Sequence, residues 1–393
     1  MHPLAGVRIL TVEQYGAGPF GTMWLADQGA EVIKIEPPDG GDYARALGPY
    51  WFKNGESQWF HAYNRNKKSL TLDLKAKEGA AVFRDLVGTA DAVVSNLRGD
   101  VPEKLGLTYA HLKNSNPKLV CAHLSAYGRT GPRAGWPGFD YLMQAEAGWF
   151  SLTGEPDHPP TRFGLSVVDQ MTGVALAYAA LAGIIRARAT GEGGDLDVSL
   201  FDVALSNLGY PAIWYLNNGY VQDRVARSAH PSLTPCQLYT TADGWIYLMC
   251  NKERFWPILC GALGRDDWAK DPRFKTFKER LDNRPLIQDM LDSALSKKTT
   301  AEWLAEFAGV VPAAPIFNVQ QALDNPFVKD QGRLQDIPLE GHGTYRYLRP
   351  PVQAAEAAPA RPAPKLGEHT AAILGELGYD ESRLTALKQG KVI

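Results

Sequence analysis

Short apolar runs alternate with helix-like segments through the first 190 residues, and this rhythm constrains the fold more than any other feature. Strands separated by helices are typical of a parallel, doubly wound sheet. The 174–189 segment is alanine-rich with little polar surface, so we expect it to form a buried helix. An α/β, Rossmann-like large domain is therefore predicted. Its expected strands are 7–12, 31–35, 92–95, 119–124, 165–168 and 196–200, and its other expected helices are 22–28 and 201–219.

The chain has 393 residues, which exceeds the size at which a single core usually stops growing, so two domains are expected. Strand-like segments at 237–241 and 246–249, followed by helices rich in tryptophan and charge, indicate a smaller α+β domain. An Ala/Pro-rich stretch, 354–364, is expected to be a surface connection. The predicted organisation is a large domain over 1–200, a linker over 201–229, the small domain over 230–325, and a linker with a C-terminal return to the large domain over 326–393.

The overall charge is close to balanced, with a net charge of -2, which gives no electrostatic case for nucleic acid or an anionic membrane as a partner. The four cysteines show no Cys-x-x-Cys pair and are expected to be buried thiols. The eight histidines lack metal-ligand spacing, so no metal site is expected. Neither a signal-like amino terminus nor eighteen uninterrupted apolar residues occurs, which favours a cytoplasmic protein.

The most conspicuous local motif is Gly16-Ala17-Gly18-Pro19-Phe20-Gly21, between an expected strand and an expected helix, with Glu36 ending the next strand. This spacing matches the dinucleotide-binding fingerprint and would suggest a dehydrogenase. Pro19, however, lacks the backbone N–H that a phosphate would use, and Gln14 and Tyr15 crowd the turn. The alternative is a tight turn in a Rossmann-like fold without a nucleotide.

Several further strings, taken in order, resemble the class III CoA-transferases. This family includes formyl-CoA:oxalate and crotonobetainyl-CoA:carnitine transferases, with the α-methylacyl-CoA racemases as relatives. The resemblance covers nearly the whole chain. It rests on residues 17–19, 29–36, 64–75, 96–98, 104–106, 138–140, 169 with 172–173, 197–200 and 366–370.

The resemblance implies that Asp169 is the catalytic nucleophile. A carboxylate needs no general base at neutral pH because it is already ionised. It would attack a thioester to give an aspartyl anhydride and then an aspartyl-CoA thioester. The alternative is structural: Asp169 caps a helix that begins near Met171. The two roles are compatible, because a helix amino terminus would also keep the carboxylate ionised.

The resemblance also implies a CoA site, with CoA as a co-substrate and no permanently bound cofactor. Leu72 and Lys75 would lie near the nucleotide. Around the diphosphate and pantetheine the resemblance places Asn96, Leu97, Lys104 and Leu105. Arg98 would supply charge that is missing at Pro37 and Pro137, where the oxalate enzymes carry cations.

A basic run precedes these residues in the chain. Arg65, Lys67 and Lys68 are further candidates for the CoA phosphates, and the alternative for the lysine pair is a solvated strand edge.

Phe139 occupies the position at which the racemases carry an acid/base histidine. A phenyl ring cannot move a proton, so the sequence favours acyl transfer over racemisation. Asp140 would then orient the thioester or the neighbouring chain, unless it is a loop aspartate bonded to its own backbone. The stretch 224–235 lacks the glycines that cover the anhydride in the oxalate enzymes. Arg227, His230 and Ser232 are the candidates for closing the site.

We therefore predict a CoA-transferase whose partners are an acyl-CoA and a small carboxylic acid. A dicarboxylate such as succinate or mesaconate is expected, with its second carboxylate paired to Arg162, Arg227 or Arg129. The resemblance implies a homodimer of interlocked subunits. Three alternatives stay open: an α-methylacyl-CoA racemase or other acyl-CoA isomerase, a dehydrogenase, and a non-catalytic CoA-binding protein.

Overall fold

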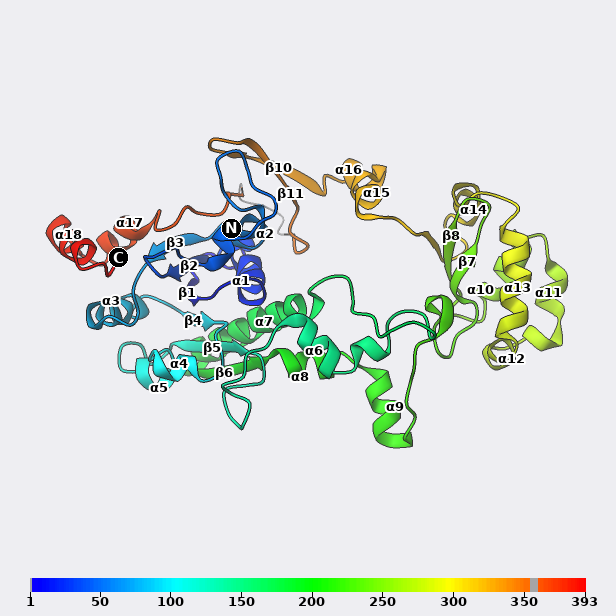
Figure 1. Cartoon of the computed structure of the whole chain (residues 1–393), viewed down its shortest axis with the longest axis horizontal. Coiled ribbons are helices and arrows are strands. Elements are labelled where there is room, and N and C mark those ends of the chain that lie inside the picture. The colour runs from blue at the N-terminus through cyan, green and yellow to red at the C-terminus, as the bar shows by residue number, and fades with distance from the viewer. Residues whose placement is uncertain (1, 354–359) are drawn as a thin grey trace. The chain divides into compact units, whose positions relative to one another are not determined.

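The computed structural model describes residues 2–353 and 360–393 (Figure 1). The chain forms two compact units. The large unit comprises Met1–Ala147, Gly164–Gly209 and Gly332–Ile393, and the small unit comprises Gly148–Phe163 and Tyr210–Gln331. The small unit therefore includes residues 148–163, which the sequence analysis assigned to the large domain. Most of the expected connection 354–364 lies outside the described residues.

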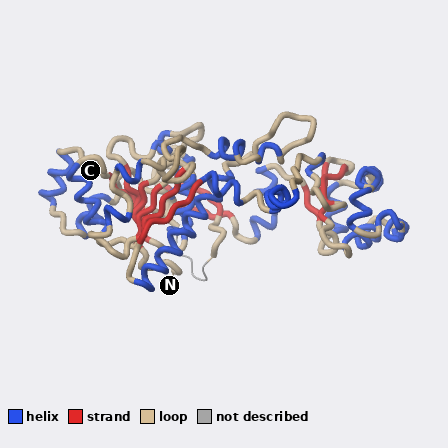
Figure 2. The backbone as a smooth tube through the Cα atoms, turned by 90° about the horizontal axis from the view of Figure 1, so that it is seen from below, coloured by secondary structure: helices blue, strands red, loops and turns tan. Residues whose placement is uncertain are grey.

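A six-stranded sheet forms the centre of the large unit (Figure 2). All neighbouring strands are parallel, in the order β3-β2-β1-β4-β5-β6. This confirms the predicted α/β class. The strands are β1 (Arg8–Val12), β2 (Glu31–Glu36), β3 (Lys68–Thr71), β4 (Ala92–Ser95), β5 (Val120–Ser125) and β6 (Gly194–Ser199).

The central strands are buried because helices cover both faces of a doubly wound sheet, which explains their nearly continuous apolar sequences. One core joins residues of β1, β2 and β4 to the apolar face of α3 (Lys77–Val87) and to α17 (Thr370–Glu376). The remaining helices of the large unit are α1 (Ala17–Asp27), α2 (Gln58–Asn64), α4 (Val101–Lys104), α5 (Tyr109–Leu112), α6 (Asp140–Glu146), α7 (Val167–Thr190), α8 (Leu200–Ser206), α18 (Glu381–Gln389) and a 3-10 helix (Tyr43–Ala46).

Helix α7 differs from the sequence prediction in two respects. It begins at Val167, so the expected strand 165–168 is wrong and the helix starts seven residues earlier than expected. It is also only partly buried, with Tyr178 74% and Ile185 70% exposed. By length and composition alone α7 could cross a membrane, but half of its most apolar window is buried inside the protein.

Helices α1 and α7 pack at very short distance, and glycines make this possible. A Cβ atom on Gly21 would lie 2.0 Å from the carbonyl oxygen of Gly173, and one on Gly173 would lie 2.4 Å from the carbonyl oxygen of Ala17. Any larger residue would force the helices apart. The last glycine of the Gly16–Gly21 motif therefore serves helix packing.

The outer edge of the sheet at β3 is closed by a distant segment of the chain. The N–H of His369 donates to the carbonyl of Ser69 at 3.0 Å, and the N–H of Thr71 donates to Oγ1 of Thr370 at 3.0 Å. These contacts cover backbone groups that an edge strand would otherwise leave unpaired. A separate hairpin, β10 (Leu334–Leu339) and β11 (Gly343–Leu348), completes the large unit.

The small unit is built on a three-stranded antiparallel sheet, as expected for a small α+β domain. Trp256, Phe274 and Trp303 are among the large side chains of its core. All four cysteines of the chain are buried and unpaired, as predicted. The strands are β7 (Cys236–Thr240), β8 (Trp245–Met249) and β9 (Ala313–Pro315); the helices are α9 (Tyr210–Asn218), α10 (Phe255–Ala262), α11 (Asp266–Lys270), α12 (Phe277–Asp282), α13 (Arg284–Leu295), α14 (Thr300–Phe307), α15 (Val319–Asp324), α16 (Pro326–Asp330) and 3-10 helices at Trp149–Ser151, Ala226–Ser228 and Pro272–Phe274.

Candidate active site

Asp169 is the third residue of α7, and its carboxylate borders a cavity of about 270 Å³ in the large unit. An ideal Cβ on Gly16 would lie 3.3 Å from Oδ2 of Asp169, so the turn before α1 approaches this carboxylate closely. Most of the other cavity residues come from the ends of β1, β4 and β5 and from the segments that follow them, whereas Tyr43 follows β2 and Leu200 begins α8. These other residues are Gln14, Tyr15, Ala17, Tyr43, Asn96, Leu97, Arg98, Leu124, Ser125, Ala126, Trp136, Pro137, Gly138, Phe139 and Leu200.

The structure contradicts the helix-cap alternative for Asp169. The helix begins before this residue, and Ser166, not Asp169, occupies the N-cap position. Within the part of the chain that the structure describes, the Asp169 carboxylate accepts no hydrogen bond. It is therefore available to a molecule in the cavity.

Asp140 lies beneath Asp169 and contacts its backbone. Oδ2 of Asp140 accepts a hydrogen bond from the N–H of Asp169 at 2.9 Å, and Oδ1 accepts one from Nε2 of Gln144 at 2.5 Å. Only 4% of Asp140 is exposed. The sequence predicts that Asp140 orients the thioester or the neighbouring chain, with a bond to its own backbone as the alternative. Its carboxylate binds the first turn of α7, which is the neighbouring chain, and so positions Asp169.

Two causes raise the pKa of Asp169 from 3.8 to about 7: burial of the carboxylate and the negative charge of Asp140. This direction is opposite to the one expected from a helix terminus, because burial penalises the charged carboxylate. A carboxylate with such a pKa is a stronger nucleophile than an ordinary aspartate, because basicity and nucleophilicity rise together.

Tyr15 and Tyr43 line the cavity together with Asp169, although the sequence analysis noted Tyr15 only at the glycine turn. Burial, followed by the charge of Asp169, raises the pKa of Tyr15. The rings of Tyr15 and Tyr43 are stacked with centroids 5.3 Å apart, and burial contributes most to raising the pKa of Tyr43 to about 12. Both phenols are therefore neutral at physiological pH.

A second cavity of about 220 Å³ brings together four of the predicted CoA residues, namely Leu72, Lys75, Leu97 and Leu105. Its wall and that of the Asp169 cavity share Gln14 and Leu97, so the two cavities adjoin. Lys75, which the sequence analysis places near the nucleotide of CoA, and Asp169 thus line adjoining cavities.

The other predicted CoA residues have different surroundings. Asn96 is fixed by two hydrogen bonds to the backbone of Gln14, at 2.8 Å and 2.7 Å. Arg98 borders the Asp169 cavity, whereas Lys104 borders neither cavity. Both cations bind Asp100, whose pKa they hold well below its usual value.

The three cations of residues 65–68 are paired with carboxylates. Arg65 forms an ion pair with Asp27, and Lys68 forms one with Glu31. Lys67 is fully buried and binds Glu13 at 2.7 Å, so the solvated-edge alternative is also wrong for this residue. These cations stabilise the fold.

The proposed arginines for a second carboxylate also have partners elsewhere. Arg129 binds Asp197, and Arg227 binds Asp292 at 2.5 Å. Arg162 donates to the carbonyl of Phe163 in the small unit. None of the three is among the described residues that line the Asp169 cavity.

His230 and Ser232, the remaining candidates for closing the site, belong to the small unit. There they contact each other and Tyr210.

A Ser-His-Asp chain, which the sequence did not signal, crosses the sheet. Oγ of Ser95 lies 2.9 Å from Nδ1 of His123, and Nε2 of His123 lies 3.1 Å from Oδ1 of Asp195. Ser95 is fully buried and is not on the cavity wall, so it cannot attack a substrate. Among the described residues no cluster suited to a metal ion was found.

Comparison with known proteins decides between the open alternatives. The family model of CoA-transferase family III matches residues 4–370. The chain belongs to CoA-transferase family III. A succinate–glutarate CoA-transferase from Agrobacterium fabrum is 36% identical over 391 residues, covering 98% of each chain. A succinyl-CoA:mesaconate CoA-transferase from Haloarcula hispanica is 34% identical, over 96% of this chain and 97% of the relative.

Solved structures agree with this assignment. A CAIB/BAIF family protein from Brucella suis matches with a TM-score of 0.81 at 34% identity, covering 96% of this chain and 99% of that one. Rv3272 from Mycobacterium tuberculosis matches with a TM-score of 0.84 at 32% identity, over 95% and 99%.

This CoA-transferase thus moves CoA between an acyl-CoA and a carboxylic acid, with CoA as co-substrate. The dehydrogenase interpretation of the glycine motif is set aside. A Cβ on Gly18 would lie 2.8 Å from the side chain of Asn96, so this glycine allows a close approach between the turn and the cavity wall.

Proposed function

We propose that this CoA-transferase works through covalent catalysis by Asp169 and that its acceptor is a dicarboxylic acid. The observation that carries the proposal is the placement of the Asp169 carboxylate: it has no hydrogen-bond partner of its own and borders the cavity that adjoins the Lys75 pocket. No other carboxylate is among the described residues on that cavity wall.

CoA transfer through Asp169 proceeds by successive substitutions at acyl carbonyl groups. The Asp169 carboxylate attacks the thioester carbonyl of the donor, which gives a mixed anhydride and CoA thiolate. The thiolate then attacks the aspartyl carbonyl, which forms an aspartyl-CoA thioester and releases the donor acid as its carboxylate. The acceptor carboxylate reverses these two steps and leaves with CoA. One thioester replaces another, so no ATP is needed.

The residues around Asp169 supply positioning and charge stabilisation. Asp140 holds the first turn of α7, and Asn96 fixes the backbone of Gln14 beside the nucleophile. The amide of Gln14 and the phenol of Tyr15 border the same cavity and can donate to the oxyanion that forms in each attack.

A trapping experiment tests the covalent step. Wild-type enzyme incubated with acyl-CoA and quenched with hydroxylamine should carry a hydroxamate at Asp169, and borohydride should reduce an aspartyl-CoA thioester there to an alcohol. Asp169→Ala and Asp169→Asn should abolish transfer, whereas exposed Asp157→Ala should not. Transfer by Asp169→Ala together with an unmodified Asp169 in the wild type would refute the proposal.

Support for a dicarboxylate comes from the relatives, whose names specify glutarate and mesaconate as acids. Glutarate and pentanoate have the same carbon count but differ in one terminal carboxylate, so they form a matched pair. We expect kcat/KM for glutarate to exceed that for pentanoate by at least about tenfold, the effect of one charge-assisted contact. Equal values would exclude recognition of the second carboxylate.

We also propose a homodimer with interlocked subunits. Support comes from large apolar side chains that α7 and α9 leave exposed, including Tyr178, Ile185 and Leu216. Such side chains are typical of subunit contacts. Light scattering at micromolar concentration should give twice the chain mass, and tagged and untagged subunits should exchange slowly. A monomer would contradict the proposal.

A further inference from the structure

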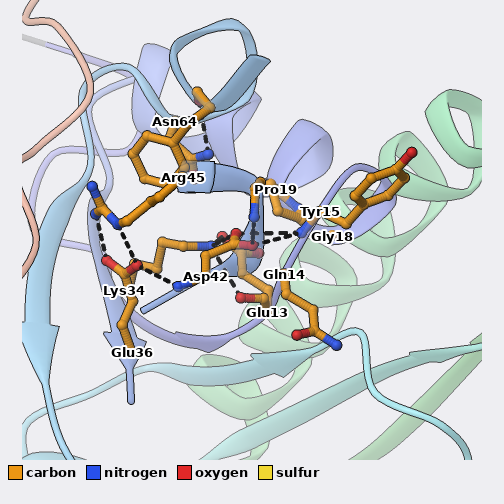
Figure 3. A network of polar contacts seen from close by, with 12 residues as sticks. Glu13, Gln14, Tyr15, Gly18, Pro19, Lys34, Glu36, Asp42, Arg45 and Asn64 are labelled. Carbon is orange, nitrogen blue, oxygen red and sulfur yellow. Dashed lines mark hydrogen bonds and ion pairs between the residues drawn. The ribbon is translucent and has the colours of Figure 1, made fainter. Parts of the chain in front are cut away.

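A cluster of buried charges lies beneath the turn that carries Gln14 and Tyr15 (Figure 3). Its acids and bases balance, since each sign occurs three times. We call this set the buried charge cluster; its members are Glu13, Lys34, Glu36, Asp42, Arg45 and Lys67.

The centre of the buried charge cluster is the pair Lys34–Asp42. Nζ of Lys34 lies 2.9 Å from Oδ2 of Asp42 and donates to the carbonyl of Glu13 at 3.0 Å. Lys34 is fully buried, and Asp42 is 2% exposed. Burial lowers the pKa of Lys34, but the surrounding carboxylates, Asp42 first, outweigh it and leave the pKa raised. The charged form of Lys34 is therefore favoured in the interior.

The Asp42 carboxylate has a second role, because it holds the backbone of Tyr15. Oδ1 of Asp42 accepts from the N–H of Tyr15 at 3.1 Å, and Oδ2 lies 3.3 Å from the same nitrogen. Tyr15 has a φ of 69°, in the left-handed region. For a residue other than glycine this conformation costs about 1 to 3 kcal/mol and persists only where surrounding contacts enforce it.

The strained turn faces the reacting group. In Figure 3 the side chains of Gln14 and Tyr15 point away from Lys34 and Asp42, while the Tyr15 backbone contacts Asp42. Gln14, Tyr15 and the following Gly16 all border the cavity of Asp169. The conformation of this turn therefore decides which groups face the nucleophile.

We propose that Asp42 is a positioning residue for CoA transfer: its carboxylate binds the Tyr15 N–H and keeps the turn in the conformation that presents Gln14 and Tyr15 to Asp169. Lys34 pairs with Asp42 at 2.9 Å and so helps to hold its carboxylate under the Tyr15 amide. Asp42 borders the CoA cavity but acts through the turn. The inference rests on the proposed role of Asp169.

Two double variants with matched charge test the proposal. Lys34→Met/Asp42→Asn removes both charges but keeps an oxygen that can accept from Tyr15. Lys34→Met/Asp42→Ala removes the same charges and the acceptor. Their comparison separates the loss of the ion pair from the loss of the Asp42 acceptor, which binds the N–H of Tyr15 and also that of Ala44 at 2.9 Å.

The first measurement is hydrogen exchange of the Tyr15 amide, resolved to the single residue. We expect protection in the wild type and in the Asn pair, and exchange about tenfold faster in the Ala pair, as for one lost buried hydrogen bond.

The second measurement is single-turnover acylation of Asp169. It should be about tenfold slower in the Ala pair than in the Asn pair, while the Kd for CoA stays within about threefold between them.

Equal Tyr15 exchange or equal acylation rates in the two pairs would overturn the inference. If Lys34→Met/Asp42→Ala does not fold, hydrogen exchange in the wild-type enzyme tests the inference. An unprotected Tyr15 amide in the folded wild type would overturn the inference, and a protected one would support it. Transfer by Asp169→Ala would refute the covalent role of Asp169 but would leave the exchange result unchanged, so the two failures are distinguishable.

Discussion

The backbone N–H of Asp169 donates to the carboxylate of Asp140 across 2.9 Å, so two carboxylates meet at the first turn of α7. Asp140 satisfies a donor that the helix cannot pair internally. At the same time its charge raises the pKa of Asp169, although burial contributes more. One side chain thereby sets both the position and the basicity of its neighbour.

This relationship predicts the pH dependence of transfer. Only the ionised carboxylate attacks, so kcat/KM should rise with pH through a midpoint near the Asp169 pKa of about 7 and then level off. Asp140→Asn retains an acceptor for the Asp169 N–H but loses the charge, so its midpoint should move to lower pH. Exposed Asp157→Asn is the control and should leave the midpoint in place. A wild-type profile that is flat between about pH 5 and 8 would contradict the prediction.

The raised pKa of Asp169 also predicts that ionisation of this residue lowers the stability of the fold. Asp169 ionises near 3.8 when unfolded and near 7 when folded, so the unfolded state binds fewer protons between these values. Stability should therefore fall as pH rises from about 4 to 7 and then stay level.

Asp169→Asn has no carboxyl group to ionise, so its stability should not fall in this way as the pH rises. Allowing for partial screening by water, its free energy of unfolding at pH 8 should exceed that of the wild type by roughly 1 to 3 kcal/mol. This difference in the free energy of unfolding should vanish near pH 4. Denaturant unfolding at pH 4 and pH 8 measures it. A variant less stable than the wild type at pH 8 would contradict the raised pKa of Asp169.

Lys75 borders the predicted nucleotide pocket, so Lys75→Ala should raise the Kd for CoA about tenfold. Lys104→Ala should raise the Kd less, because Lys104 is bound to Asp100 and lies outside both cavities. Exposed Lys118→Ala is the control. Calorimetric titration at low and high salt measures these effects, and the Lys75 effect should shrink with salt. Unchanged binding in Lys75→Ala would remove this residue from the CoA site.

The α1–α7 contact predicts opposite outcomes for two Gly→Ala substitutions within helices. At Gly173 the new Cβ would collide with the backbone of α1, so we expect a loss of roughly 3 kcal/mol in the free energy of unfolding. At Gly375, in α17, the Cβ would meet nothing within 4 Å. Ala should stabilise this position by about 0.5 to 1 kcal/mol. Thermal unfolding measures both, and equal shifts would contradict the close packing.

Sequence reasoning succeeded where local pattern and burial agree. The strands β1, β2, β4 and β5 were predicted within one residue at each end. β1, β4 and β5 are short, mostly apolar runs, and β2 holds three β-branched apolar residues among its charged ones. Sequence reasoning failed at residues 165–168, where the β-branched pair Val167-Val168 indicated a strand. The helix starts there because Asp140, 29 residues earlier, caps the Asp169 amide.

The site was only partly predictable for a similar reason. Leu72, Lys75, Leu97 and Leu105 do gather around one cavity. Lys67, by contrast, is buried and forms an ion pair with Glu13, which lies 54 residues earlier in the chain. No local sequence pattern signals that pairing. The left-handed backbone conformation of Tyr15 could not be predicted from the sequence either, because it depends on the carboxylate of Asp42, 27 residues later in the chain.

The closure of β3 has a consequence for biosynthesis. The backbone carbonyl of Ser69 is bound by the N–H of His369, which the ribosome adds 300 residues later, after the whole small unit has been made. Until then the edge of the large sheet presents unpaired backbone groups, a template for intermolecular pairing. Chaperones that shield nascent chains should therefore raise the soluble yield of this protein, and a shortened chain that ends before Gly367 should aggregate as it is synthesised.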